Sequence, residues 1–235
     1  GLFPTRGAPG SPVAARAFRL DDADRLQALS GYRDPDPDRL HQLREVTALA
    51  ARLLRVQASM LALVDRDRVI VHAFQGMRAL ASLEVSPIWD AILGGDPLFV
   101  WQADPALDSV EIPLLTPGAA TPGLFVAAPL VSPENAVIGA LCISDAAPRP
   151  LSPDDRATLT MLADQAMSLM ELHRVIRREA EARQAAATLA GRTRIAFSLA
   201  GLGDWRWAPA TDLTVLSPRA AQIYGLPADQ PLRRE

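Results

Sequence analysis

The sequence predicts an α+β fold that is followed by a long helix and a second, shorter segment. Three observations lead to this prediction. Apolar residues recur at helical spacing between residues 37 and 55. Continuous apolar runs of strand length, bounded by turn residues, follow at residues 59–64, 124–131 and 136–144. A long helical run then extends from Ser152 to about Leu189 and connects this first segment to a second, Trp-containing one.

The N-terminal part is predicted to contain a flexible tail and two helices. Residues 1–20 form the tail, because their first part is rich in Pro, Gly and Ala and lacks periodicity. Residues 20–29 can form a short helix. The next helix is expected from Pro37 to about Arg55, with Asp36 as its N-cap. An Asp side chain accepts hydrogen bonds from the free N–H groups of the first turn, and Pro at the first helical position has no N–H group that needs an acceptor.

The strands are predicted from apolar runs that turns separate. Residues 59–64 and 68–74 form a hairpin around Asp65-Arg66-Asp67. The following elements are expected in the order helix, strand, Pro-rich loop, strand and strand, at residues 87–93, 98–101, 104–123, 124–131 and 136–144. Pro129 must lie where the sheet needs no backbone donor, at an edge or a bulge.

The long helix is predicted to begin with a capping box. Ser152 is the N-cap, Pro153 the first helical residue, and Asp155 follows three residues after the cap in place of the usual Glu. We predict that its apolar stripe forms a dimer contact and transmits a signal. The stripe consists of Leu159, Leu162, Ala166, Leu169, Leu172 and Ile176. Its heptad spacing extends over two steps, which is shorter than a coiled coil requires.

Residues 25–175 resemble a GAF domain of bacterial signalling proteins. The likeness lies in three blocks that occur in the order of the family: DPDPDRLHQLREVTALAARLLRVQASMLALVDRDR, SPIWDAILGGDPLFV and APLVSPENAVIGALCISDAAPRPLSPDD. The resemblance implies a central antiparallel sheet with helices on one face and a small-molecule pocket, closed by loops and short helices, on the other. It places the sensor domain at residues 21–151 and a signalling connector helix at 152–193, whose first part packs on that domain.

Residues 194–235 resemble the start of a PAS domain. The segment RIAFSLAGLGDWRWAPATDLTVLSPRAAQIYGLPADQ has a helical lead-in, strands near residues 204–208 and 214–216, and a short helix at 218–224. The remaining strands of a PAS fold are absent, so this domain is incomplete. Tandem GAF and PAS modules usually precede a histidine kinase or a cyclic-dinucleotide enzyme, which implies an output domain that follows this segment.

Composition excludes several classes of function. With 24 basic and 27 acidic residues the net charge is −3, which does not suggest nucleic-acid binding. No apolar run reaches the length of a membrane span, so we expect no membrane contact by this segment. The single cysteine, Cys142, excludes an intramolecular disulfide framework and fits a cytoplasmic location.

The resemblance also singles out residues that could line the pocket. Where relatives carry a Cys and a His in the short helix, this chain has Trp89 and Asp90. In the next block, Gln102 stands where relatives carry an acidic residue, and Trp101 precedes it. Val126 stands where relatives carry an aromatic residue. Bulk therefore replaces small polar groups, so either the ligand is more apolar or Trp89 and Trp101 fill the cavity. The pocket candidates are His72, Phe74, Ser86, Trp89, Asp90, Trp101, Phe125, Val126 and Cys142.

No catalytic or metal site is predicted. Cys142 lies alone in an apolar strand, which favours a buried hydrophobic role over redox chemistry. The three histidines, His41, His72 and His173, lack the spacing of metal ligands. We assign no cofactor to the chain. The pocket could hold a small-molecule ligand of unknown identity.

These observations predict a cytoplasmic sensory module that acts as a homodimer through its helices and relays a signal to an output domain, first of all a histidine kinase. The alternatives are the input module of a cyclic-dinucleotide cyclase or phosphodiesterase, a dimerisation module that binds no ligand, and a GAF-type methionine-sulfoxide reductase. The lone Cys142 argues against the reductase.

Overall fold

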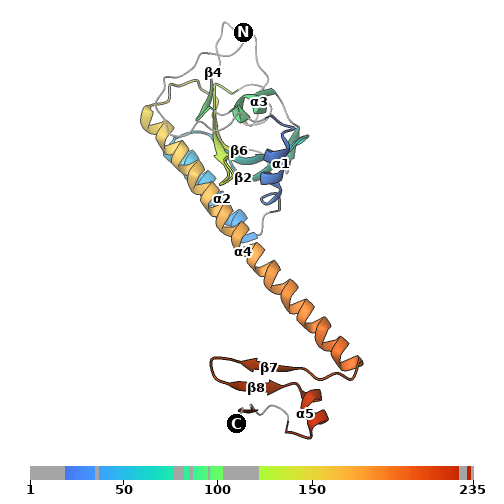
Figure 1. Cartoon of the computed structure of the whole chain (residues 1–235). Helices are drawn as coiled ribbons and strands as arrows, with labels where there is room; N and C mark the ends of the chain where they lie inside the picture. Colours follow the sequence, from blue (N-terminus) through green and yellow to red (C-terminus); the bar gives the residue numbers. More distant parts are fainter. Residues whose placement is uncertain are drawn as a thin grey trace. The chain divides into compact units, whose positions relative to one another are not determined.

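The computed structural model describes residues 19–34, 37–76, 82–84, 87–94, 96–102, 122–227 and 232–233. The chain forms two compact units, Gly1–Val175 and Ile176–Glu235, which are described separately. Helix α4 (Pro153–Leu199) belongs to both units (Figure 1). Within the described residues, no helix is sufficiently long and apolar to cross a membrane.

The first unit is built on an antiparallel sheet. Its strands are β1 (Ala58–Val64), β2 (Arg68–Gln75), β3 (Ser82–Glu84), β4 (Phe99–Gln102), β5 (Leu124–Val131) and β6 (Val137–Asp145). They are arranged in the order β3-β2-β1-β6-β5-β4. The central strands β1 and β6 are buried along almost their whole length, as expected of continuous apolar runs that are covered on both faces.

Among the described residues, three helices accompany the sheet besides α4: α1 (Ala23–Ser30), α2 (Pro37–Leu53) and α3 (Pro87–Leu93). Helix α2 runs antiparallel to α4. The Arg149 guanidinium, just before α4, donates to the Leu54 carbonyl at the end of α2, whereas Gln42 near the start of α2 contacts His173 at 2.9 Å. In Figure 1, α2 lies behind the first half of α4 and follows the line of its axis.

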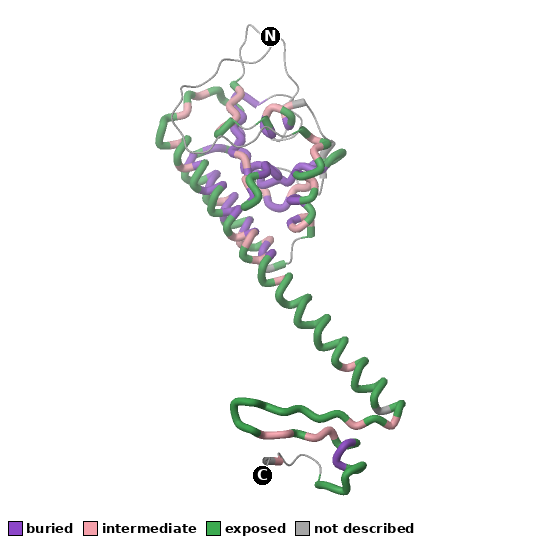
Figure 2. Tube along the Cα trace, in the orientation of Figure 1, coloured by how far each residue is buried: buried purple, intermediate pink, exposed green. Residues whose placement is uncertain are grey.

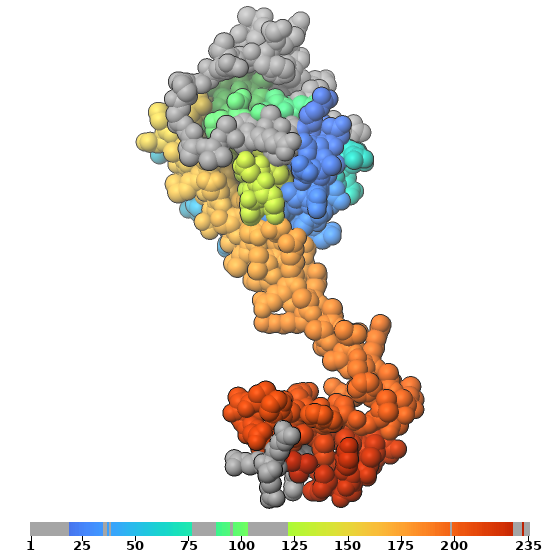
Figure 3. All heavy atoms as spheres, viewed as in Figure 1, coloured from blue at the N-terminus to red at the C-terminus, as the bar shows by residue number. Residues whose placement is uncertain are grey.

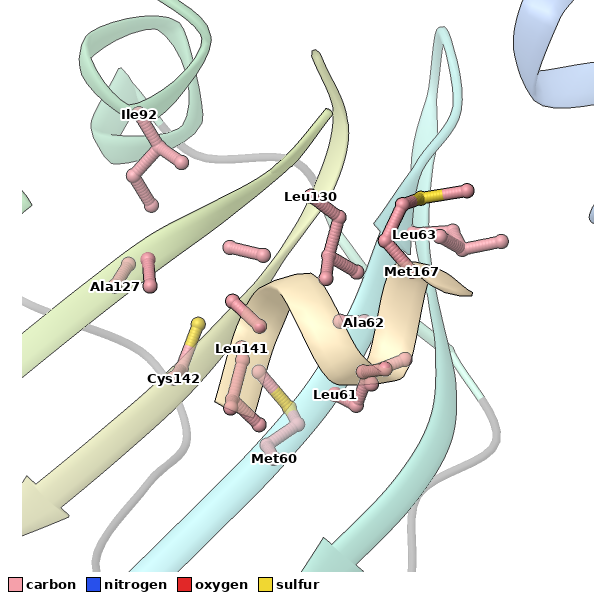
Figure 4. Close-up of a cluster of buried hydrophobic side chains, with 14 of the residues drawn as sticks. Met60, Leu61, Ala62, Leu63, Ile92, Ala127, Leu130, Leu141, Cys142 and Met167 are labelled. Atoms are coloured by element: carbon pink, nitrogen blue, oxygen red, sulfur yellow. The ribbon is translucent and has the colours of Figure 1, made fainter. Parts of the chain in front are cut away.

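Strand register defines the two faces of the sheet. The Ser59 hydroxyl donates to the Thr47 carbonyl of α2 at 2.6 Å, so Ser59 lies on the face that α2 covers, hereafter the helix face. Leu61 and its partner Leu141 share that face, and Figure 4 shows them beside the segment of α4 that carries Met167. The opposite face carries Met60, Cys142 and Ala127, toward which Ile92 of α3 points (Figure 4). We call it the α3 face.

Close backbone approach and burial stabilise the centre of the sheet. Figure 2 shows that the buried residues of the first unit gather in the sheet and along the flank of α4 that faces it. At Gly139 of β6, a Cβ atom would lie 2.1 Å from the Ala62 carbonyl oxygen of β1. Such a close approach is typical of a glycine inside a strand.

The second unit contains a small sheet and a helix. Strands β7 (Trp205–Ala208), β8 (Leu213–Leu216) and β9 (Leu232–Arg233) pair in that order. Helix α5 (Pro218–Tyr224) begins at Ser217, whose hydroxyl accepts from the Ala220 N–H. The positions of β7, β8 and α5 agree with the sequence prediction within one residue.

The α+β fold class is confirmed, and most element boundaries agree closely with prediction. The capping box forms, since the Asp155 N–H donates to the Ser152 hydroxyl at 3.0 Å and the Ser152 N–H donates to the Asp155 carboxylate at 3.1 Å. The pairing of β5 with β4 ends at Ala127. Pro129, which pairs with Ala140 of β6, lies beyond that point, so its missing N–H removes no hydrogen bond to β4.

Two predictions of elements require correction. Strand β3 was not expected, because its three residues are too few to show a periodic pattern. Helix α4 continues to Leu199, beyond the expected end at residue 193, since its Ala-rich and charged continuation favours helix and contains no Pro. The predicted loop at 104–123 and the predicted N-cap Asp36 lie outside the described residues, except for residues 122 and 123 of the loop.

Candidate functional site

The α3 face of the sheet brings together four of the predicted pocket residues. Phe74, Trp101, Phe125 and Cys142 occupy it on four different strands, β2, β4, β5 and β6. Phe125 packs against Phe99 with ring centroids 6.1 Å apart and planes tilted by 60°, the inclined arrangement that aromatic rings prefer. Phe125 and Cys142 are fully buried, whereas Phe74 and Trp101 are partly exposed.

Helix α3 adds Trp89 to this group. Trp89, Ile92 and Leu93 are all buried, and their spacing of three and four residues places them on one side of the helix. Ile92 shows that this side faces β5 and β6 (Figure 4). Asp90 is exposed and follows Trp89 by one residue, so it lies on another side of α3 than the buried group. Ser86 lies outside the described residues.

Val126 and His72 also require correction. Val126 pairs with Ile143 and Val100, which lie on the helix face, because side chains alternate along a strand and Phe125 occupies the α3 face. The register between β1 and β2 shifts between Leu61 and Ala62, opposite His72, so simple alternation fails there.

His72 is buried among charged groups of α2 and of the connection that precedes it. Only 5% of the residue is exposed, and neither ring nitrogen has a hydrogen-bond partner. Burial, followed by the positive charge of Arg39, lowers the pKa of His72 to about 4, and the negative charge of Asp34 opposes this only in part. The imidazole is therefore neutral at pH 7, and the positive charge that acts on it belongs to α2, the helix that covers the helix face.

The α3 face presents mainly hydrocarbon and sulfur-containing side chains. Burial raises the pKa of the Cys142 thiol, so this cysteine is neither a thiolate nucleophile nor a metal ligand at neutral pH. Within the described part of the chain, no three His, Cys, Asp or Glu side chains lie close enough to hold a metal ion. Aromatic and sulfur-containing side chains in this arrangement suit contact with an apolar or aromatic group.

The predicted dimer stripe of α4 divides into a buried and an exposed part. Leu159 and Ala166 are 1% and 0% exposed because they pack in the core of the first unit. Leu162 is also buried, and Leu169 is partly so. Leu172 and Ile176 are 55% and 54% exposed. Only the later part of the stripe is therefore free to contact another molecule.

Apolar side chains also lie exposed on α2 beside α4. Leu49 and Leu53 are 42% and 55% exposed and lie on the same side of α2 as Gln42, because residues seven and four apart share a helix face. Gln42 contacts His173, which follows Leu169 by one helical turn. Leu49, Leu53, Leu169 and Leu172 thus border the line of contact between α2 and α4, and we call them the seam surface.

A buried charged cluster at the junction of α1, α4 and the β5–β6 turn was missed by sequence reasoning. The side chain of Arg174 on α4 is only 9% exposed. Its guanidinium donates to both carboxylate oxygens of Glu171, at 2.7 and 2.8 Å, and to Glu134 of the turn at 3.2 Å. The guanidinium also lies 5.1 Å from the centre of the Tyr32 ring. We call these residues, together with Gly31, the Arg174 cluster.

The cluster holds its charges in their ionised forms. The hydrogen bond with Glu171 raises the pKa of Arg174. Burial alone would raise the pKa of Glu171, but hydrogen bonds from Arg174 and from the Tyr32 hydroxyl, at 2.5 Å, lower it below its ordinary value. No sequence signal indicates this cluster, because Tyr32 and Glu171 are far apart in the chain.

Solved structures with a similar chain trace carry GAF domains. The blue-light absorbing form of the Thermosynechococcus elongatus PixJ GAF domain is 16% identical, with a TM-score of 0.48; the match covers 70% of this chain and 98% of that one. The GAF-B domain of DevS from Mycobacterium smegmatis is 21% identical, with a TM-score of 0.46, covering 61% and 99%. The GAF domain of a phosphoenolpyruvate-protein phosphotransferase from Coxiella burnetii is 16% identical, with a TM-score of 0.49, covering 66% and 95%.

The family model decides the assignment. No curated protein matches the chain. The GAF domain model matches residues 41–171, which are more than half of the chain and extend from α2 to the part of α4 that packs on the sheet. The chain therefore belongs to the GAF domain family, whose members are sensory and regulatory modules of signalling proteins.

Proposed function

We propose that this chain is the dimeric input module of a signal-transduction protein, in which the GAF domain relays its state through α4 to an output domain. One observation carries the proposal. Helix α4 begins in the core of the GAF domain, where Leu159, Ala163 and Ala166 are buried, and continues without interruption to Leu199. A single continuous helix thus connects the sheet to the segment that follows it.

The seam surface supports a second copy of the chain as the partner. It is apolar, largely exposed and built from two helices, so two copies related by a two-fold axis would form a bundle of four helices. The output domain that we favour is a histidine kinase, and the alternative is a cyclic-dinucleotide enzyme. This choice rests on the resemblance of residues 194–235 to a PAS domain. The segment itself would carry no catalysis and would act in the cytoplasm.

The ligand of the GAF domain, if it binds one, would be apolar or aromatic. Phe74, Phe125 and Trp101 offer flat hydrocarbon surfaces, and Cys142 is uncharged. A second candidate function, a dimerisation module without a ligand, is favoured by Trp89, because a side chain of this size that is only 5% exposed fills much of the space beside the sheet. Native mass spectrometry of the purified chain separates these two readings: a co-purified small molecule rejects the second.

Sedimentation velocity tests the dimer. We expect a dimer for the parent chain and a shift toward monomer for Leu172→Arg, because a charge at an exposed apolar position costs nothing in the free chain but repels its copy. Thr160→Arg is the matched control. Thr160 is also exposed on α4, but its twelve-residue separation from Leu172 places it on another side of the helix. A monomeric parent chain, or equal dimerisation of both variants, would contradict the proposed interface.

A further inference from the structure

We propose that the Arg174 cluster couples the β5–β6 hairpin to helix α4, so that a displacement of the hairpin moves the helix where it leaves the GAF domain. The inference rests on the proposed function, because it specifies how the relay through α4 is controlled. It concerns positioning: no residue of the cluster is required to touch a ligand.

The hairpin end of the contact is firmly held. Within the turn, the Asn135 N–H donates to the Ser132 carbonyl at 2.8 Å, and the Ser132 N–H donates to the Ala136 carbonyl at 2.9 Å. Glu134 lies between these bonds, so its carboxylate moves with the hairpin. The hairpin strands β5 and β6 also carry Phe125 and Cys142 on the α3 face. The same two strands thus connect that face directly to the turn that holds Glu134.

The helix end is held just as firmly. Glu171 and Arg174 are one turn apart on α4 and form a bidentate ion pair, which fixes the direction of the guanidinium. A Cβ atom on Gly31 would lie 2.9 Å from the Arg174 Cδ, so the Arg174 stem packs closely against the chain after α1. Figure 3 shows the surface of the β5–β6 hairpin between those of α1 and α4.

The cluster differs in kind from the other contacts of α4 with the sheet. Leu159, Ala163 and Met170 make apolar contacts, which are not directional and allow small displacements. The Glu134–Arg174 ion pair and the Tyr32–Glu171 hydrogen bond are directional, and the Arg174 guanidinium that joins them is largely removed from water. A movement of the hairpin must either carry Arg174 with it or break a charged contact, and for this reason we assign the coupling to this cluster.

Spin-label distance measurements test the coupling. Labels at Pro133→Cys, in the turn, and Arg178→Cys, on α4, are introduced in a Cys142→Ala background. The labelled chain is diluted with unlabelled chain so that only distances within one chain are recorded. We expect one narrow distance distribution, which broadens in Glu134→Gln and in Arg174→Gln. Amide exchange at residues 171–175 should also become faster by about tenfold, because a charged hydrogen bond is lost.

Arg183→Gln is the matched control, because it removes an exposed ion pair with Glu179 on the same helix and should leave the distribution unchanged. Glu134→Gln keeps the test valid if Arg174→Gln does not fold, since the Glu134 side chain is 48% exposed. Distributions as narrow as that of the parent in every variant that folds would overturn the coupling. A monomeric chain with a broadened distribution would reject the proposed dimer but support the coupling.

Discussion

The buried His72 should make the GAF domain sensitive to mild acid. In the folded chain the pKa of this imidazole is lowered to about 4, and in the unfolded chain it returns to about 6.5. Between these two pH values the unfolded chain binds a proton that the folded chain does not bind. The free energy of unfolding therefore falls as the pH decreases from 6.5 toward 4 and receives no further contribution from His72 below that value.

The size of the effect follows from the two pKa values. At about 1.4 kcal/mol for each pH unit between them, His72 should remove about 3 kcal/mol of stability by pH 4. This is a large share of the stability of a typical domain, which is about 5–15 kcal/mol. Replacement by Leu should abolish this contribution. It should not destabilise the domain at pH 7, because it also removes two buried nitrogens without hydrogen-bond partners.

Urea unfolding at several pH values between 7 and 4 provides the assay. Trp89 is buried in the first unit, whereas Trp205 and Trp207 are 63% and 47% exposed in the second, so the change in tryptophan fluorescence mainly reports unfolding of the GAF domain. His41→Gln is the matched control, because it removes an exposed histidine from α2. Equal losses of stability between pH 7 and pH 4 in the parent chain and in His72→Leu would refute the reasoning.

Three further predictions concern local features. Ser152→Ala should lower the free energy of unfolding by about 1 kcal/mol in urea titrations through loss of the capping box, whereas Ser168→Ala, on the exposed side of α4, should have little effect. Gly139→Ala should lower it by about 1–3 kcal/mol, because the new methyl group would collide with the Ala62 carbonyl; Gly191→Ala, with no atom within 4 Å, should instead raise helicity by circular dichroism. Cys142 should react with a thiol reagent at pH 8 only after urea unfolding, since burial raises its pKa, and rapid labelling of the folded chain would contradict this placement.

The parts of the fold that the sequence predicts well are those that local periodicity determines. The strands at 124–131 and 137–145 and the helix that Ser152 caps could be recognised because each has a repeated apolar pattern or a specific start signal. The site was less predictable because it depends on contacts between distant residues. The bulge near Leu61 redirects His72, and the burial of Arg174 depends on Tyr32 and Glu134. Neither effect has a signature within a short window of sequence.

The pairing of β1 with β6 has a consequence for synthesis of the chain on the ribosome. The β1–β2 hairpin can form early, but the partner on the other edge of β1 is made only after the whole intervening segment. Until then β1, in which every residue is buried in the folded domain, presents an apolar edge that can pair with another chain. Slow elongation before residue 137 should therefore favour aggregation of the nascent protein, and early binding of a chaperone to the N-terminal half should prevent it.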